Sequence, residues 1–217
     1  MIRMAFTAVV CLAMAMPATA NLVQNGSFEQ GTQNPGTHVT LYEGSTVITG
    51  WTVIGGVTLY DDSDSESVDY IGATWTASDG DRSLDLNGYY GTGGVEQILS
   101  TMPGQAYTVT FDMAGNPDGD PTLKTMDVLA IGSATQSQSY SFDITGKTRS
   151  AMGWAPMRFS FVADAPATTL RFVSTVTGDQ DAWGPALDNV NVVPVPGAVL
   201  LGMLGLSAAG IRLRKRA

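Results

Sequence analysis

Cysteine, histidine and basic side chains are scarce in this chain of 217 residues. The only cysteine is Cys11, the only histidine is His38, and Lys and Arg together number 11. Cys11 lies in an N-terminal segment that we expect to be removed. Disulfides, thiol catalysis and cysteine-ligated zinc are then excluded for the mature chain. Its fold must rest on a hydrophobic core.

The first twenty residues have the pattern of a secretory signal peptide. Arg3 is their only charge, an apolar run extends from Met4 to Met16, and the small-x-small triplet at 18–20 suits signal peptidase. The alternative, an N-terminal helix of the folded domain, fits poorly because the run is too short to span a bilayer and ends at a cleavage-like triplet. The sequence predicts a mature chain that begins at Asn21.

The C-terminal segment 194–217 predicts a membrane anchor. Residues 195–211 are uncharged and apolar, and a basic tail follows at 212–216 with Arg212, Arg214, Lys215 and Arg216. Basic residues stay cytoplasmic, so the preceding domain would lie outside. At about 1.5 Å per residue, this segment is near the lower limit for crossing about 30 Å of hydrocarbon. A buried core helix is disfavoured because it would not end in four cations.

The same tail resembles a known sorting signal. The residues that open it are Val193, Pro194, Val195, Pro196 and Gly197. Followed by an apolar helix and a basic end, they are similar to the PEP-CTERM signal of Gram-negative bacteria, in its VPLPA-like variant. The resemblance implies processing by an exosortase and delivery to the cell surface or the extracellular polysaccharide matrix. It leaves open whether the tail is cleaved or retained in the inner membrane.

The segment between these two ends, residues 21–193, is strongly acidic. It holds all twenty Asp and Glu residues and six of the basic ones, which gives a net charge of −14. Phosphate binding needs clustered cations, so nucleic acid is excluded as a partner class. An acidic surface keeps an exported protein soluble and can hold divalent cations.

Residues 21–193 read as one all-β domain. Residues 107–113 alternate apolar and polar side chains, residues 157–162 repeat the pattern, and residues 170–173 are expected to form a hairpin with 157–162. Other strands are expected around 22–28, 47–54, 57–60, 83–87, 95–99, 126–131, 139–144 and 187–193. About ten antiparallel strands favour a β-sandwich or jelly-roll.

Five short segments carry a second resemblance. They are Asn21–Glu29, Gly50–Trp51, Ser83–Gly88, Gly94–Gln97 and Gly184–Val190. In this order they resemble the domain-of-unknown-function 642 and choice-of-anchor C proteins, over nearly all of 21–193. The resemblance implies a galactose-binding-domain-like sandwich of the kind found in carbohydrate modules.

The resemblance also implies a structural calcium ion. In such modules the first and last of these segments lie on adjacent strands, so Glu29 and Asp188 are the carboxylates expected to bind it. The alternative is that both carboxylates only cap backbone amides. The acidic run 61–66 lacks the glycine of an EF-hand loop, and Asp79-Gly80-Asp81 has the composition of a turn.

Aromatic side chains in loops are the candidates for sugar binding, because an aromatic face can stack on a pyranose ring. They are Trp75, Tyr89, Tyr90, Trp154 and Trp183. The alternative is that they pack over the edge of the sandwich. Trp51 has apolar neighbours on both sides and is expected in the core.

Catalytic signals are weak. A Ser-His-Asp arrangement would depend entirely on His38, which reads as an exposed residue at the start of a strand. The sequence therefore predicts a non-enzymatic, exported protein that binds polysaccharide. One alternative is a structural matrix protein that associates through calcium and its acidic surface. A glycoside hydrolase with two facing carboxylates is the less favoured alternative.

Overall fold

The computed structural model describes residues 21–55, 67–89, 91–176 and 182–196, and every regular element in them is a β-strand. The strands are β1 (His38–Tyr42), β2 (Thr52–Gly55), β3 (Ser67–Ile71), β4 (Ser83–Asp85), β5 (Asn87–Gly88), β6 (Gly91–Ser100), β7 (Ala106–Gly115), β8 (Leu123–Ile131), β9 (Thr135–Asp143), β10 (Ala155–Val162), β11 (Ala167–Ser174) and β12 (Pro185–Pro194). The predicted all-β class is confirmed.

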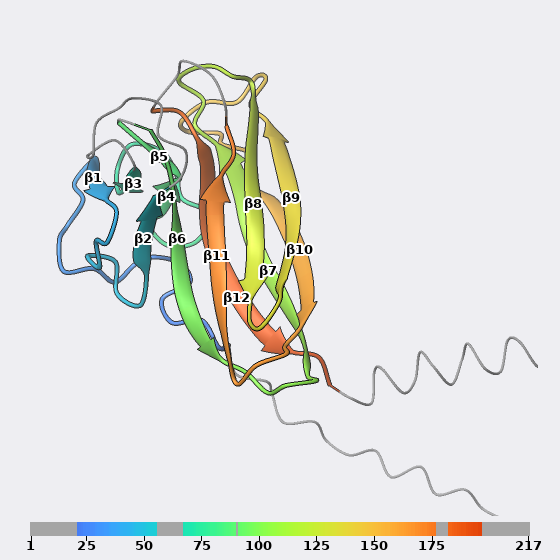
Figure 1. Cartoon of the computed structure of the whole chain (residues 1–217). Coiled ribbons are helices and arrows are strands. Elements are labelled where there is room, and N and C mark those ends of the chain that lie inside the picture. Colours follow the sequence, from blue (N-terminus) through green and yellow to red (C-terminus); the bar gives the residue numbers. More distant parts are fainter. Residues whose placement is uncertain (1–20, 56–66, 90, 177–181, 197–217) are drawn as a thin grey trace, which may run out of the picture. The chain divides into compact units, whose positions relative to one another are not determined.

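Two antiparallel sheets lie face to face (Figure 1). One has the order β1-β3-β4-β12-β7-β10 and the other has the order β2-β6-β11-β8-β9, with β5 paired to β6. The alternation of apolar and polar side chains along the strands explains why the two sheets pack together. The inward side chains of β7, such as Val109, Phe111 and Met113, are at most 1 % exposed. The predicted antiparallel sandwich is confirmed.

Two local predictions are wrong. Residues 157–162 and 170–173 do not pair, because β10 joins β7 in one sheet whereas β11 lies between β6 and β8 in the other. The chain crosses from one sheet to the other at Ala163–Pro166. The two strands that this connection joins, β10 and β11, therefore lie in different sheets and do not form a hairpin. Residues 22–28 form turns instead of a strand, and the strand expected at 57–60 lies outside the described residues.

A chain of aromatic rings crosses the core between the sheets. Ring centroids are 5.4 Å apart for Phe28 and Trp51, 6.2 Å for Trp51 and Phe172, and 5.1 Å for Phe172 and Phe111. All four side chains are at most 2 % exposed. The expectation that Trp51 belongs to the core is confirmed. Because Phe28 is fully buried here, the core also fixes where the next residue, Glu29, emerges.

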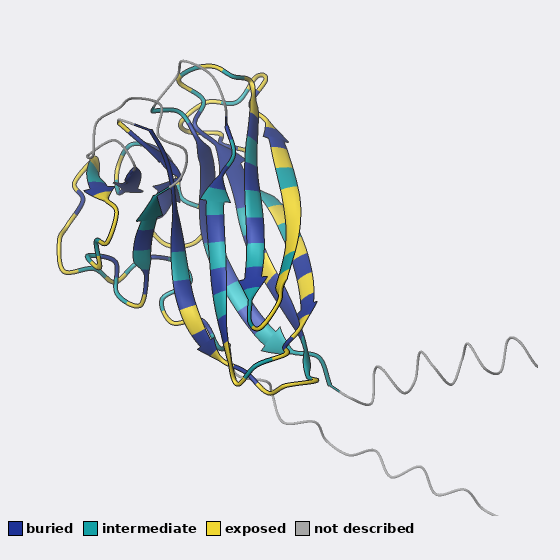
Figure 2. Cartoon of the chain, viewed as in Figure 1, coloured by how far each residue is buried: buried dark blue, intermediate teal, exposed yellow. Residues whose placement is uncertain are grey.

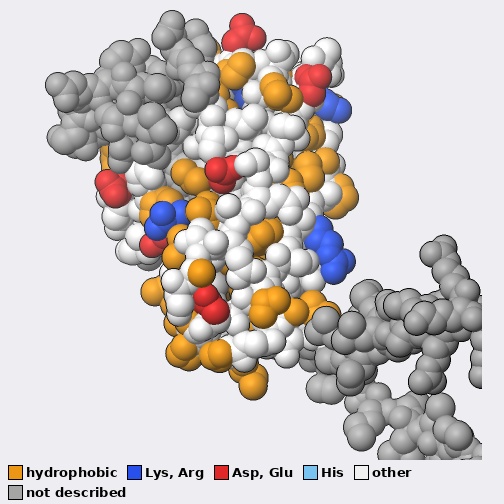
Figure 3. Space-filling model, turned by 45° about the vertical axis from the view of Figure 1, so that its right-hand side comes forward, with side chains coloured by type: hydrophobic (Ala, Val, Ile, Leu, Met, Phe, Trp, Pro, Cys, Tyr) orange, Lys and Arg blue, Asp and Glu red, His pale blue; other side chains and the backbone are white. Residues whose placement is uncertain are grey.

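Exposed side chains follow the outward positions of the strands (Figure 2). On the face drawn in Figure 3, Lys and Arg side chains are separate from one another and lie among polar and scattered hydrophobic groups. The two ion pairs in the described residues, Arg149–Asp118 and Arg171–Glu96, each join one cation to one carboxylate. On this face the described residues form no basic stripe that could follow a nucleic-acid backbone.

Residues 21–195 form one compact unit. Its last strand extends through Pro194, and the Val195 amide donates to the carbonyl oxygen of Ala106 at 2.8 Å. No helix in the described part of the chain has the length and apolar character needed to cross a bilayer. The predicted signal peptide at 1–20 and the anchor from Gly197 onward lie outside the described residues.

Candidate functional site

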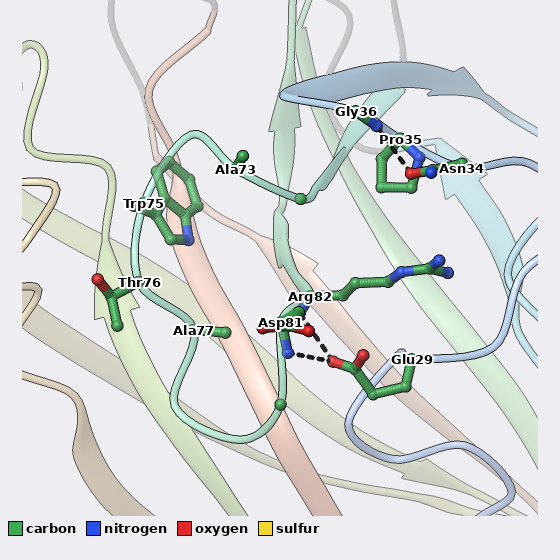
Figure 4. Close-up of a pocket in the computed structure, with 12 residues that line it drawn as sticks. Glu29, Asn34, Pro35, Gly36, Ala73, Trp75, Thr76, Ala77, Asp81 and Arg82 are labelled. Atoms are coloured by element: carbon green, nitrogen blue, oxygen red, sulfur yellow. Dashed lines mark hydrogen bonds between the residues drawn. The ribbon is translucent and has the colours of Figure 1, made fainter.

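A cleft of about 560 Å³ opens between the loop before β1 and the loop that joins β3 to β4 (Figure 4). One wall is formed by residues 29–36 and the other by residues 72–82. Its volume lies within the range of about 300–1,000 Å³ that is usual for small-ligand sites. Carboxylate, amide, guanidinium and indole groups line it, from Glu29, Asn34, Trp75, Asp81 and Arg82.

Glu29 holds the second wall in place. Its Oε1 accepts hydrogen bonds from the amides of Asp81 at 2.8 Å and Arg82 at 2.7 Å, and the carboxylate turns toward this backbone in Figure 4. Gly80 makes the approach possible. Its φ is +71°, and a Cβ atom there would lie 2.4 Å from Glu29 Oε1. The predicted turn at 79–81 is therefore a glycine turn that is closed around a carboxylate.

Asp188 on β12 holds the same loop from the other side. Its Oδ2 accepts from the amides of Ser78 at 2.7 Å and Asp79 at 2.9 Å. Asp112, its partner on β7, accepts from the Ser78 hydroxyl at 2.6 Å. Residues 78–82 are thus bound by carboxylates from sequence positions more than a hundred residues apart.

Burial raises the pKa of Asp188 to about 7, and the nearby Asp79 carboxylate adds to the rise. Hydrogen bonds from the amides of Asp79, Asn189 and Ser78 oppose the shift, because they favour the charged form. Desolvation is the larger effect. Asp188 therefore changes charge near neutral pH while it contacts the loop of the cleft.

Arg82 brings the cationic group of the cleft. Its Nη1 donates to the Tyr70 hydroxyl at 2.6 Å, and its guanidinium carbon lies 5.5 Å from the centroid of the Tyr70 ring. That hydroxyl in turn donates to the carbonyl oxygen of Phe28 at 2.6 Å. Because Tyr70 is fully buried, the guanidinium is oriented by a rigid aromatic support.

Of the predicted aromatic residues, Trp75 lines the cleft. It is only 6 % exposed, and its Nε1 donates to the Ser83 hydroxyl at 2.8 Å. It can therefore supply an apolar wall but not an open stacking platform. Trp154 lies behind the loop, where its Nε1 donates to the carbonyl oxygen of Thr76 at 2.9 Å.

The other predicted aromatic residues lie elsewhere. Tyr89 is 63 % exposed after β5, and Tyr90 is outside the described residues. Trp183 packs against Gly119, and its carbonyl oxygen accepts from Lys124 Nζ at 2.7 Å. Neither Tyr89 nor Trp183 borders the cleft. Many aromatic residues lie in loops, so a loop position in the sequence was not enough to predict which of them share one site.

The calcium ligands predicted from the resemblance, Glu29 and Asp188, converge on one loop through its backbone amides. The first and last segments do lie side by side, since the Val190 amide donates to the carbonyl oxygen of Gly26 at 2.8 Å. In the described part of the chain no three His, Cys, Asp or Glu side chains are grouped to hold a metal ion. Calcium at these two residues stays a prediction.

The predicted site residues did not include Asn34, Asp81 and Arg82, whose polar groups line the cleft. Each lies in a loop whose composition signals only a turn. Their convergence depends on the pairing of β3 with β4, which places the loop between these strands beside residues 29–36. His38, which begins β1, is exposed as expected.

Comparison with known proteins places this chain among relatives that are much longer. It is 32 % identical over 177 residues to halomucin from Haloquadratum walsbyi, a match that covers 80 % of this chain and 2 % of halomucin. It is 22 % identical over 179 residues to the Arabidopsis thaliana protein DUF642 L-galactono-1,4-lactone-responsive gene 1. That match covers 82 % of this chain and 44 % of the plant protein. The chain thus spans less than half of either relative.

Solved structures with a similar fold include an arabinose-bound α-L-arabinofuranosidase, with a TM-score of 0.52 at 11 % identity over 81 % of this chain and 26 % of that one. A family 16 carbohydrate-binding module gives a TM-score of 0.46 at 16 % identity over 80 % and 99 % of the two chains. The model of the family described as "Protein of unknown function (DUF642)" matches residues 21–193. The chain therefore belongs to the DUF642 family.

Proposed function

We propose that this protein binds carbohydrate without catalysis and that the cleft between residues 29–36 and 72–82 holds the sugar. The observation that carries the proposal is the meeting of carboxylate, guanidinium, amide and indole groups around one volume of about 560 Å³. Sugars present hydroxyls around a ring with apolar faces, so a protein site needs directional polar groups together with an apolar wall.

Each lining group has a role in this proposal. The guanidinium of Arg82, oriented by Tyr70, donates hydrogen bonds to sugar hydroxyl or ring oxygens. The carboxylate of Asp81 and the side-chain amide of Asn34 accept from hydroxyls. Trp75 forms the apolar wall. Because Glu29 already accepts two backbone amides, we assign it to shaping the cleft, which favours binding over glycoside hydrolysis.

We further propose that the protein is exported and acts at the cell surface or in an extracellular matrix. The proposal rests on the signal-peptide pattern at 1–20 and on the PEP-CTERM-like tail, whose partners would be an exosortase and the membrane. The acidic domain would face polysaccharide outside the cell. Association through calcium and the acidic surface, without a sugar site, is the alternative that the binding experiment separates.

The test is a glycan array and a pull-down on insoluble polysaccharides with the full-length chain. Arg82→Ala should lose binding, because it removes the oriented guanidinium from the cleft. Arg158→Ala is the matched control. That arginine lies on β10, donates to the Thr108 hydroxyl at 3.0 Å and does not line the cleft. Equal retention by both variants would place the sugar elsewhere, and no binding by the wild type would favour the matrix alternative.

A further inference from the structure

Four polar side chains on β3, β4 and β5 are buried and do not line the cleft. Asp69 and Asp85 are direct partners across the antiparallel β3–β4 pair. Ser67 precedes Asp69 by two residues and Asn87 follows Asp85 by two, so both lie next to this pair. Asp69 is 8 % exposed and the other three are fully buried.

Two of their oxygen atoms lie near the same point. The Oδ1 atoms of Asp85 and Asn87 both lie 2.5 Å from the position that a Cβ atom on Gly184 would occupy. The Ser67 hydroxyl lies 2.1 Å from the equivalent position on Gly88, the residue after Asn87. Only glycine at these two positions leaves room for the oxygens.

Within the part of the chain that the structure describes, two of these side chains have polar atoms without a hydrogen-bond partner. They are the Oδ1 and Nδ2 atoms of Asn87 and the Oγ atom of Ser67, all fully buried. A buried amide or hydroxyl without a partner costs about 1–3 kcal/mol. Such groups in a stable fold therefore point to a species that the polypeptide itself does not supply.

The charges at this position identify the kind of species. Two buried carboxylates face each other across paired strands, which is unfavourable. Hydrogen bonds offset part of this cost, because Asp85 accepts from the amides of Asn87 and Gly184 and from Asn116 Nδ2, and Asp69 accepts from the Thr40 hydroxyl. These donors are all neutral, whereas a cation would also balance the two negative charges. In the described ranges, no Lys or Arg nitrogen is within 4 Å of Asp69 or Asp85. Lys124, the nearby buried cation, donates instead to the carbonyl oxygens of Gly119 and Trp183.

We propose that Ser67, Asp69, Asp85 and Asn87 bind a calcium ion beside the β3–β4 pair. Two carboxylates, an amide oxygen and a hydroxyl are the oxygen ligands that this hard cation prefers. A water molecule could satisfy Asn87 and Ser67 but would leave the two carboxylates opposed. A sugar ring needs an open volume, and three of the four side chains are fully enclosed. The site is distinct from the predicted one at Glu29 and Asp188.

The first test is thermal unfolding of the full-length chain, treated with chelator and then titrated with CaCl₂. At a free calcium concentration about 100 times Kd, Tm should rise by about 5–10 °C. Asn87→Ala and Asp69→Asn should lose this rise. Glu29→Gln should retain it, and so should Asp127→Asn, whose carboxylate accepts from Ser139 on the other sheet. A rise lost in Glu29→Gln but kept in Asn87→Ala would overturn the proposal, as would no response in the wild type.

The second test does not depend on variants that fold. A crystal structure of the wild-type chain grown with calcium should show an anomalous peak about 2.3–2.6 Å from Asn87 Oδ1. A peak without anomalous signal at hydrogen-bond distance, about 2.7–3.2 Å, would identify a water molecule and refute the cation site.

Discussion

Replacing Glu29 by alanine should weaken both the fold and the proposed sugar site. The substitution removes two hydrogen bonds from backbone amides to a carboxylate, at 2.7 and 2.8 Å. Hydrogen bonds to charged groups contribute about 1.5–3 kcal/mol each, and solvent reaches one of these two. The free energy of unfolding should therefore fall by about 2–4 kcal/mol. The loop at 78–82, no longer held at both ends, should lose its position in the cleft.

The chain contains a matched control for this experiment. Asp164 accepts the amides of Ser133 and Ala134, both at 2.8 Å, and a Cβ atom on the preceding Gly132 would lie 2.0 Å from its Oδ1. As at Glu29 and Gly80, a carboxylate accepts two backbone amides beside a glycine, although here each amide donates to a different carboxylate oxygen. The contact joins the β10–β11 connection to the β8–β9 loop and does not line the cleft. Asp164→Ala should therefore lower stability by a similar amount and leave sugar binding unchanged.

Two measurements on the same samples decide the outcome. Urea unfolding gives the free energy of each variant, and retention on the polysaccharide identified by the pull-down gives its affinity. Glu29→Ala should bind at least about tenfold more weakly, which corresponds to about 1.4 kcal/mol. If Glu29→Ala lost stability but bound as tightly as Asp164→Ala, the assignment of the 78–82 loop to the sugar site would be refuted.

Three further predictions concern the same loop. Gly80→Ala should cost about 1–3 kcal/mol in urea unfolding, because φ is +71° and the new methyl group would meet Glu29; an unchanged midpoint would contradict this geometry. The pKa of Asp188 is raised to about 7, so the folded state binds more protons than the unfolded state between about pH 4 and 7. The unfolding free energy should therefore fall as pH rises through that window, by up to about 1.4 kcal/mol per pH unit. Asp188→Asn should flatten this slope, and an equal slope in both proteins would argue against the assigned pKa. Trp154→Phe should weaken sugar retention through loss of its bond to Thr76, whereas Trp183→Phe, whose indole is outside the cleft, should not.

The fold class was predictable because alternation needs only neighbouring residues. In β7 the apolar side chains at 107, 109, 111 and 113 all proved to be buried, as their spacing of two indicated. Strand partners were not predictable from the same pattern. Residues 157–162 and 170–173 have matching alternation and a short connection, yet each pairs with a strand more than forty residues earlier in the chain.

The candidate site was predictable in part. Glu29 and Asp188 were singled out by the resemblance, and both do act at one loop, though through backbone amides. Trp75 was singled out as a loop aromatic and lines the cleft, whereas Tyr89 and Trp183 have the same local composition and do not. The residues next to each aromatic residue in the sequence therefore did not indicate which one lies in the cleft.

The sequence by itself determined the properties that depend on composition and short spacing: an acidic domain without cysteine, β-strands with one buried face, and a turn at Gly80. The tertiary structure decided which distant residues meet. Burial of Phe28 sets the position of Glu29, the pairing of β12 with β7 brings Asp188 beside Ser78, and the β3–β4 register opposes Asp69 and Asp85. These contacts arise because strand pairing joins segments far apart in the chain, and no local pattern encodes the partner.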